Sequence, residues 1–281
     1  MPGPSDLPEP EVASSAGMPG TGQPPRPLPE SLRMALDAYI SEVDRELPGV
    51  LTGLYVVGSV ALGDYTPKLS DVDLVSVGDE AWTSDSLEIA RRAHHHLSRR
   101  KHPVRVAYAS FSQLAADPSS GEIACFENSQ RLPAEELANP FTWQILATDA
   151  VALRGPAHPE VALSRVALEQ WADRQLHDHW RKWLESARHQ HGALLFRRSV
   201  AGKVLEVSRL YEAATTGMVL SKLDAGQALL PQLNSSEARV IRDATGYRQG
   251  YHASMYWAAF ERRHDALQLI DELTAPAPVA T

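Results

Sequence analysis

The stretch LYVVGSVALGDYTPKLSDVDLVSV, residues 54–77, decides the fold expected for this chain. Its first four residues are apolar and rich in β-branched side chains, which predicts a buried strand, and the following Gly58-Ser59 pair predicts a turn that ends it. A second turn signal, GDYTP at 63–67, precedes DVDLVSV at 71–77, which has the composition of another strand. Two successive strands indicate a β-sheet in this half of the chain.

The residues beside these turns are also suited to binding a metal ion and phosphates. Side chains alternate along a strand, so Asp71 and Asp73 are expected on the same face. Paired carboxylates suit Mg²⁺, which can share them with the oxygens of a triphosphate. Gly58 and Ser59 offer bare backbone and a hydroxyl to phosphates, and residues 60–63 are expected to open a helix whose N-terminus favours anions. The combination predicts nucleotidyl transfer, with an ordinary acidic hairpin as the alternative.

This Gly-Ser pair followed by Ser70-Asp71-Val72-Asp73 resembles the nucleotidyltransferase superfamily, and within it the streptomycin/spectinomycin adenylyltransferases that modify aminoglycoside and aminocyclitol antibiotics. Residues 147–156, ATDAVALRGP, look like the helix end that opens the helical domain of those enzymes. Residues 204–222 are similar to their C-terminal signature, and the resemblance spans roughly residues 50 to 260. It implies Mg²⁺ bound by Asp71 and Asp73, and ATP contacted by Gly58, Ser59, Ser70, Arg209, Lys222 and Tyr247.

One position departs from the family. The resemblance implies a glutamate, acting as the base for the acceptor hydroxyl, on the strand after the Asp-x-Asp hairpin, but PVRVAY at 103–108 has Arg105 there. An arginine cannot serve as a base at neutral pH. Three explanations stay open: another carboxylate substitutes, the metal and bulk water suffice, or the protein binds nucleotide without transferring it. Glu122 and Glu127 lie just downstream, although solvated loop acids are the more ordinary interpretation of both.

The acceptor-binding positions of the family have no recognisable counterpart before Val204. Residues 170–183 instead are rich in acids, imidazoles and indoles. Asp173 lies one helical turn before His177, which permits an acid/base pair, and the tryptophans can stack on a sugar ring or fill core. The run His94-His95-His96 points in three directions on a helix, which favours a solvated or packed face over a metal site.

The composition bounds the partners. The chain of 281 residues has a formal charge of −8 and a pI near 5.8, which argues against a nucleic-acid binder and fits a cationic small-molecule acceptor. There is one cysteine, Cys125, and no apolar run long enough to cross a membrane, so a cytoplasmic location is expected. A monomer is the expected state.

The apolar periodicity predicts an α+β protein in which a mixed β-sheet with helices precedes an all-α C-terminal bundle. The expected division is a disordered tail at 1–29, a nucleotidyltransferase domain at 30–138 and a helical domain at 139–275. Helices are predicted at 32–47, 84–100, 142–153, 161–187, 194–215, 224–230 and 253–273. The predicted activity is transfer of AMP from ATP to a hydroxyl of an aminoglycoside or aminocyclitol. The alternatives are a catalytically degenerate nucleotide-binding regulator and a transferase acting on another metabolite or protein.

Overall fold

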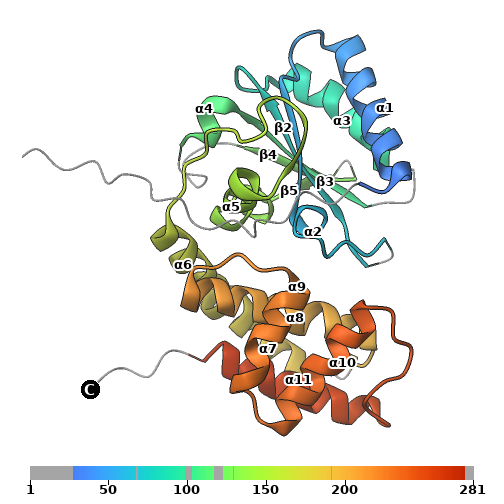
Figure 1. Ribbon diagram of the computed structural model, residues 1–281, viewed down its shortest axis with the longest axis vertical. Coiled ribbons are helices and arrows are strands. Elements are labelled where there is room, and N and C mark those ends of the chain that lie inside the picture. Colours follow the sequence, from blue (N-terminus) through green and yellow to red (C-terminus); the bar gives the residue numbers. More distant parts are fainter. Residues whose placement is uncertain are drawn as a thin grey trace, which may run out of the picture.

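The computed structural model describes residues 28–67, 69–98, 103–116, 123–128, 130–190 and 192–275, apart from the side chains of 96–98. A sheet with its covering helices forms one half, and a group of helices forms the other (Figure 1). The tail expected at residues 1–29 lies almost entirely outside the described residues. The observed architecture confirms the predicted α+β class.

The sheet has six strands in the order β5-β4-β3-β2-β1-β6. Only β2 and β3 run parallel, and the other neighbours are antiparallel, so the sheet is mixed. Nearly all residues of β1, β2 and β3 are buried, so both faces of the central sheet are covered. The strands are β1 Gly53–Val57, β2 Val72–Gly78, β3 Val104–Ser110, β4 Ala124–Glu127, β5 Gln130–Leu132 and β6 Val151–Arg154.

The two faces of the sheet bury different layers. Helices α1 (Glu30–Glu46) and α3 (Ser84–Ser98) cover one face and enclose an apolar cluster with β1, β2 and β3 (Figure 1). The other face packs against α5 (Pro140–Thr148), and that second cluster continues without interruption into the helical half. The second of these two apolar clusters is therefore shared by both halves.

The helical half is organised around α8, which packs against α6, α9, α10 and α11. A π-helical turn, Gln175–Trp180, joins α6 to α7. Helix α10 was not among the predicted helices, although Asn234 and Glu237 form a capping box at its start. The helices are α6 Arg165–Arg174, α7 Arg181–His189, α8 Arg197–Thr216, α9 Lys222–Leu229, α10 Ser235–Arg248 and α11 Ala259–Leu273; shorter turns are α2 Gly58–Ala61, α4 Phe111–Leu114, Ala134–Glu136 and Leu230–Gln232.

The prediction of one helix over residues 142–153 was wrong at its end. Helix α5 stops at Thr148, and Val151–Arg154 pairs antiparallel with the outer edge of β1. The free backbone groups of that edge outweigh the helical periodicity of the segment. Arg154 fixes the new strand by donating two hydrogen bonds of 2.6 Å to Asp44 of α1. The sheet thus includes residues on both sides of the boundary expected between 138 and 139.

Candidate active site

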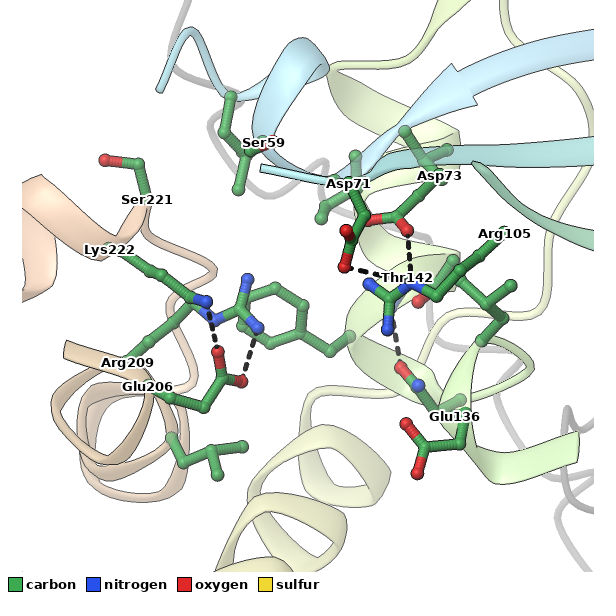
Figure 2. Close-up of a pocket in the computed structure, with 18 of the residues that line it drawn as sticks. Ser59, Asp71, Asp73, Arg105, Glu136, Thr142, Glu206, Arg209, Ser221 and Lys222 are labelled. Carbon is green, nitrogen blue, oxygen red and sulfur yellow. Dashed lines mark hydrogen bonds and ion pairs between the residues drawn. The ribbon is translucent and has the colours of Figure 1, made fainter. Parts of the chain in front are cut away.

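The two motif aspartates lie side by side where β2 begins. Asp73 belongs to β2 and pairs in register with Val57 of β1 and with Arg105 of β3. Asp71 comes immediately before the strand, which starts at Val72 and not at residue 71 as expected. Asp71 and Asp73 both line one cavity, on the side of the sheet that faces the helical half (Figure 2).

Gly58 lets the chain pass close to Asp73. Its φ is +63°, in the left-handed region, and a Cβ at this position would clash with Asp73 Oδ2. The expected helix at 60–63 is instead the four-residue turn α2, which starts at Gly58 itself. So short a helix adds little dipole, and any phosphate contact here depends on local groups such as Ser59, which lines the cavity.

The cations of the C-terminal signature line the same cavity from the helical side. Arg209 projects from α8 and Lys222 from the start of α9 (Figure 2). Both pair with Glu206, at 2.5 Å for Arg209 Nη2 and 2.9 Å for Lys222 Nζ. Burial would raise the pKa of Glu206, but the two cations outweigh it and lower that pKa. Glu206 was not predicted as a site residue, because its spacing from Arg209 is that of an ordinary helix-surface pair.

A buried ion pair joins the two halves beside the cavity. Arg248, at the end of α10, donates from Nε to both carboxylate oxygens of Asp64, at 2.8 and 2.9 Å. Its Nη2 donates to the Asp64 carbonyl at 2.7 Å and to Ser70 Oγ at 3.1 Å. Ser70 therefore lines the cavity with its hydroxyl bound by Arg248, and its proposed contact with nucleotide stays a prediction. Tyr247 is not among the described residues that line the cavity and packs under the Arg197 guanidinium, so its proposed contact with nucleotide stays a prediction.

Arg105 occupies the place expected for a base and binds the motif carboxylates. Its Nε lies 2.7 Å from Asp73 Oδ1 and 3.9 Å from Asp71 Oδ2 (Figure 2). Asp73 raises the pKa of Arg105 against the effect of burial, so the guanidinium stays charged. Burial raises the pKa of Asp71, an effect that Arg105 opposes and Asp73 reinforces. The site thus contains a permanent cation between two carboxylates.

The described residues contain other proton acceptors at the cavity. Glu135 and Glu136, from the short turn after β5, and His179 line it. Glu127 pairs in register with Arg105 across β3 and β4 but is not among the described lining residues, and Glu122 lies outside the described residues. Glu135 and Glu136 were not predicted as site residues. They reach the cavity because the β4–β5 hairpin leads the chain back to it just before α5.

The indole- and imidazole-rich segment turns part of its surface to the cavity. Its π-helical turn presents Gln175, His179 and Trp180, and Trp171 precedes them. A π-turn inserts an extra residue into a helix and is frequent at functional sites. His177 points elsewhere: it pairs with Asp173 at 3.1 Å, and its Nδ1 lies 3.1 Å from the Thr274 carbonyl oxygen.

The cavity has a volume of about 440 Å³ and receives charged groups of both signs. Asp71, Asp73 and Arg105 lie on its sheet side and Glu206, Arg209 and Lys222 on its helical side (Figure 2). Magnesium fits this donor set: Asp71 is 41% exposed and both aspartates offer hard oxygens, while phosphate oxygens and water can complete the shell. In the described parts of the chain, no group of three or more His, Cys, Asp or Glu is placed to hold a metal. His94 is buried instead, with Nε2 2.9 Å from the Val104 carbonyl oxygen.

Comparison with known proteins supports the class that this geometry indicates. Residues 36–115 match the family model of the nucleotidyltransferase domain, which includes β1, β2, β3 and both motif aspartates. Residues 36–115 are therefore similar to a nucleotidyltransferase domain, as the sequence motif predicted. No curated protein matches the chain in sequence.

The fold extends the likeness beyond that domain. The structure is similar to that of spectinomycin adenyltransferase AAD(9) from Enterococcus faecialis, crystallised with ATP and spectinomycin, with a TM-score of 0.58 and 15% identity. The match covers 86% of this chain and 99% of that chain. The expected resemblance to aminoglycoside adenylyltransferases, helical domain included, is confirmed at the level of fold. Among the described helices, none is both long and apolar enough to cross a membrane.

Proposed function

We propose that the protein transfers AMP from ATP to a hydroxyl of a small acceptor, an aminoglycoside or aminocyclitol. One observation carries the proposal: Asp71 and Asp73 from the sheet and Arg209 and Lys222 from the helices line a single cavity. Nucleotidyl transfer needs cation-binding carboxylates on one side of a triphosphate and positive charge on the other. The structural neighbour, crystallised with ATP and spectinomycin, supports the choice of donor and acceptor.

The residues on each side of the cavity have separate tasks in binding. Arg209 and Lys222 attract the phosphates, while Gly58 and Ser59 let them approach the turn after β1. Asp71 and Asp73 would hold magnesium, which would supply Lewis-acid polarisation of the phosphate. Binding the triphosphate between these groups aligns it for attack, so positioning and electrostatics contribute most of the rate.

In the transfer step the acceptor oxygen forms a bond to the α-phosphorus, and the bond between the α-phosphorus and the oxygen that bridges to the β-phosphate breaks. Pyrophosphate leaves, and Arg209 and Lys222 offset its charge. The acceptor proton passes to a base, and Arg105 cannot accept it. Glu135, Glu136 and His179 line the cavity and carry groups that can accept it.

The acceptor side of the cavity supports a cationic sugar-like molecule. Glu135 and Glu136 supply negative charge, and Trp171 and Trp180 offer aromatic surface for a ring. We place the reaction in the cytoplasm, where ATP is available, and expect a monomer without nucleic-acid partners, in keeping with the acidic charge of −8.

The test is direct. Purified protein is incubated with ATP, magnesium and an aminoglycoside and aminocyclitol panel that includes streptomycin and spectinomycin, and pyrophosphate release and acceptor mass are followed. Asp71→Asn and Asp73→Asn are the matched controls, because they keep side-chain shape and remove charge. Adenylylated product that disappears in both controls supports the proposal. Pyrophosphate release without a product of increased mass, or no release with any acceptor, contradicts it.

A second candidate is a nucleotide-binding regulator without transferase activity. The Arg105–Asp73 ion pair favours it, because part of the expected metal-binding charge is neutralised within the chain. Binding of ATP without product, followed by gained transfer in Arg105→Glu, would favour this candidate. Product formed on a cellular metabolite or a protein hydroxyl, and on no antibiotic, would instead identify a transferase with another acceptor.

A further inference from the structure

Arg105 is built into the cation site by the sheet itself. Strands β2 and β3 run parallel with Asp73 and Arg105 as Cα partners, so their side chains leave the same face at the same level. Residues on both sides of Arg105 are buried in the strand, which fixes where its side chain starts. The strand pairing therefore holds the Arg105 guanidinium beside the two carboxylates.

The contact with Arg105 leaves one of the two Asp73 carboxylate oxygens for a metal ion. Its side chain is 13% exposed, and Oδ1 accepts a 2.7 Å hydrogen bond from Arg105 Nε. Oδ2 lies against Gly58, where even a methyl group would clash. A carboxylate that bridges two metal ions needs both oxygens, and one oxygen of Asp73 is already bound by a cation.

Asp71 is in a different position. It is 41% exposed, and its closest contact with Arg105 is 3.9 Å, longer than a hydrogen bond. Its carboxylate is the more open of the two to a metal ion that also binds phosphate. A second divalent ion at the pair would meet the positive guanidinium at short range, and like charges in a partly buried site repel strongly.

We propose that the Arg105 guanidinium takes the place of a second divalent cation, so that the site binds one divalent cation together with the nucleotide. Asp71 would hold that ion, together with the Asp73 oxygen that Arg105 does not bind. The inference rests on the proposed nucleotide site and concerns how many ions it holds. Arg105 is thus a positioning residue that fixes Asp73 and limits the metal content.

The experiment counts bound ions without using catalysis. Mn²⁺ replaces magnesium as an EPR-visible probe, and α,β-methylene-ATP replaces ATP because it cannot release pyrophosphate. Free Mn²⁺ is measured at saturating nucleotide for the wild type, Arg105→Lys and Arg105→Glu, with nucleotide alone as the blank and thermal unfolding to verify that each variant folds. Nucleotide binding is measured in parallel by calorimetry.

The expected result is one Mn²⁺ per chain in the wild type and in Arg105→Lys, which keeps the charge, and two in Arg105→Glu, which replaces it with a ligand. Two ions in the wild type would overturn the inference, and that count requires no variant. A folded Arg105→Glu protein that binds only one ion would overturn it as well. A wild type that binds nucleotide with one ion but adenylylates no acceptor would refute the proposed function and leave the ion count supported.

Discussion

The ion pair between Arg248 and Asp64 makes a quantitative prediction about stability. The two side chains are 7% and 4% exposed, and Arg248 makes its hydrogen bonds to groups of the sheet half. Arg248→Met keeps most of the aliphatic stem but leaves the Asp64 carboxylate buried without its partner. Removing one member of a buried pair costs about 3–5 kcal/mol of unfolding free energy. For a chain of this size the corresponding fall in Tm is about 10 °C.

Urea denaturation followed by circular dichroism measures this change, and a thermal melt checks it. The matched control is Arg45→Met, because Arg45 is 69% exposed and pairs with exposed Glu46 on the helix surface. Surface pairs of this kind contribute about 0–1 kcal/mol. The double variant Arg248→Met/Asp64→Leu should regain part of the loss, since it removes the stranded charge. If Arg248→Met unfolds at the same urea concentration as Arg45→Met, the reasoning is refuted.

Three further changes test the site and its surroundings. Gly58→Ala should displace Asp73 and abolish transfer. The control is Gly202→Ala, whose added methyl group meets no atom within 4 Å and should stabilise α8 by about 0.5–1 kcal/mol. Equal transferase activity in the two variants would contradict this prediction. Burial lowers the pKa of His94 from 6.5 to about 4, so the unfolded state binds the extra proton and stability should fall as pH drops through that interval. Urea titrations of His94→Gln should show a shallower fall, and equal slopes would exclude His94 as its cause. Glu206→Gln should lower the calorimetric Kd for ATP several-fold by freeing the two cations, and weaker binding would show that Glu206 positions them instead.

Much of the sheet side of the site could be predicted because its signals are local. Gly58, Asp71 and Asp73 lie within one hairpin, where strand alternation and turn chemistry constrain their geometry. Arg105 was placed in the next strand, and the parallel register then determined that it meets Asp73. For this side of the site, the local sequence was enough to predict which residues come together.

The helical side and the join between the halves were less accessible. Arg209 and Lys222 were reached only through resemblance, because nothing in their local pattern distinguishes them from other helix cations. The Arg248 pair spans residues 64 and 248, and no periodicity connects positions so distant. The strand at 151–154 was read as helix because its partner, the edge of β1, exists only in the folded sheet.

The pairing of β6 with β1 has a consequence for how the chain is made. All five residues of β1 are buried in the finished protein, yet one edge of this strand is paired by a segment that follows α5. While the ribosome adds residues 58–150, that edge offers unpaired backbone groups on an apolar strand, the kind of surface that recruits other chains. Slower translation across this interval would prolong the exposure, and we expect it to lower the yield of soluble protein.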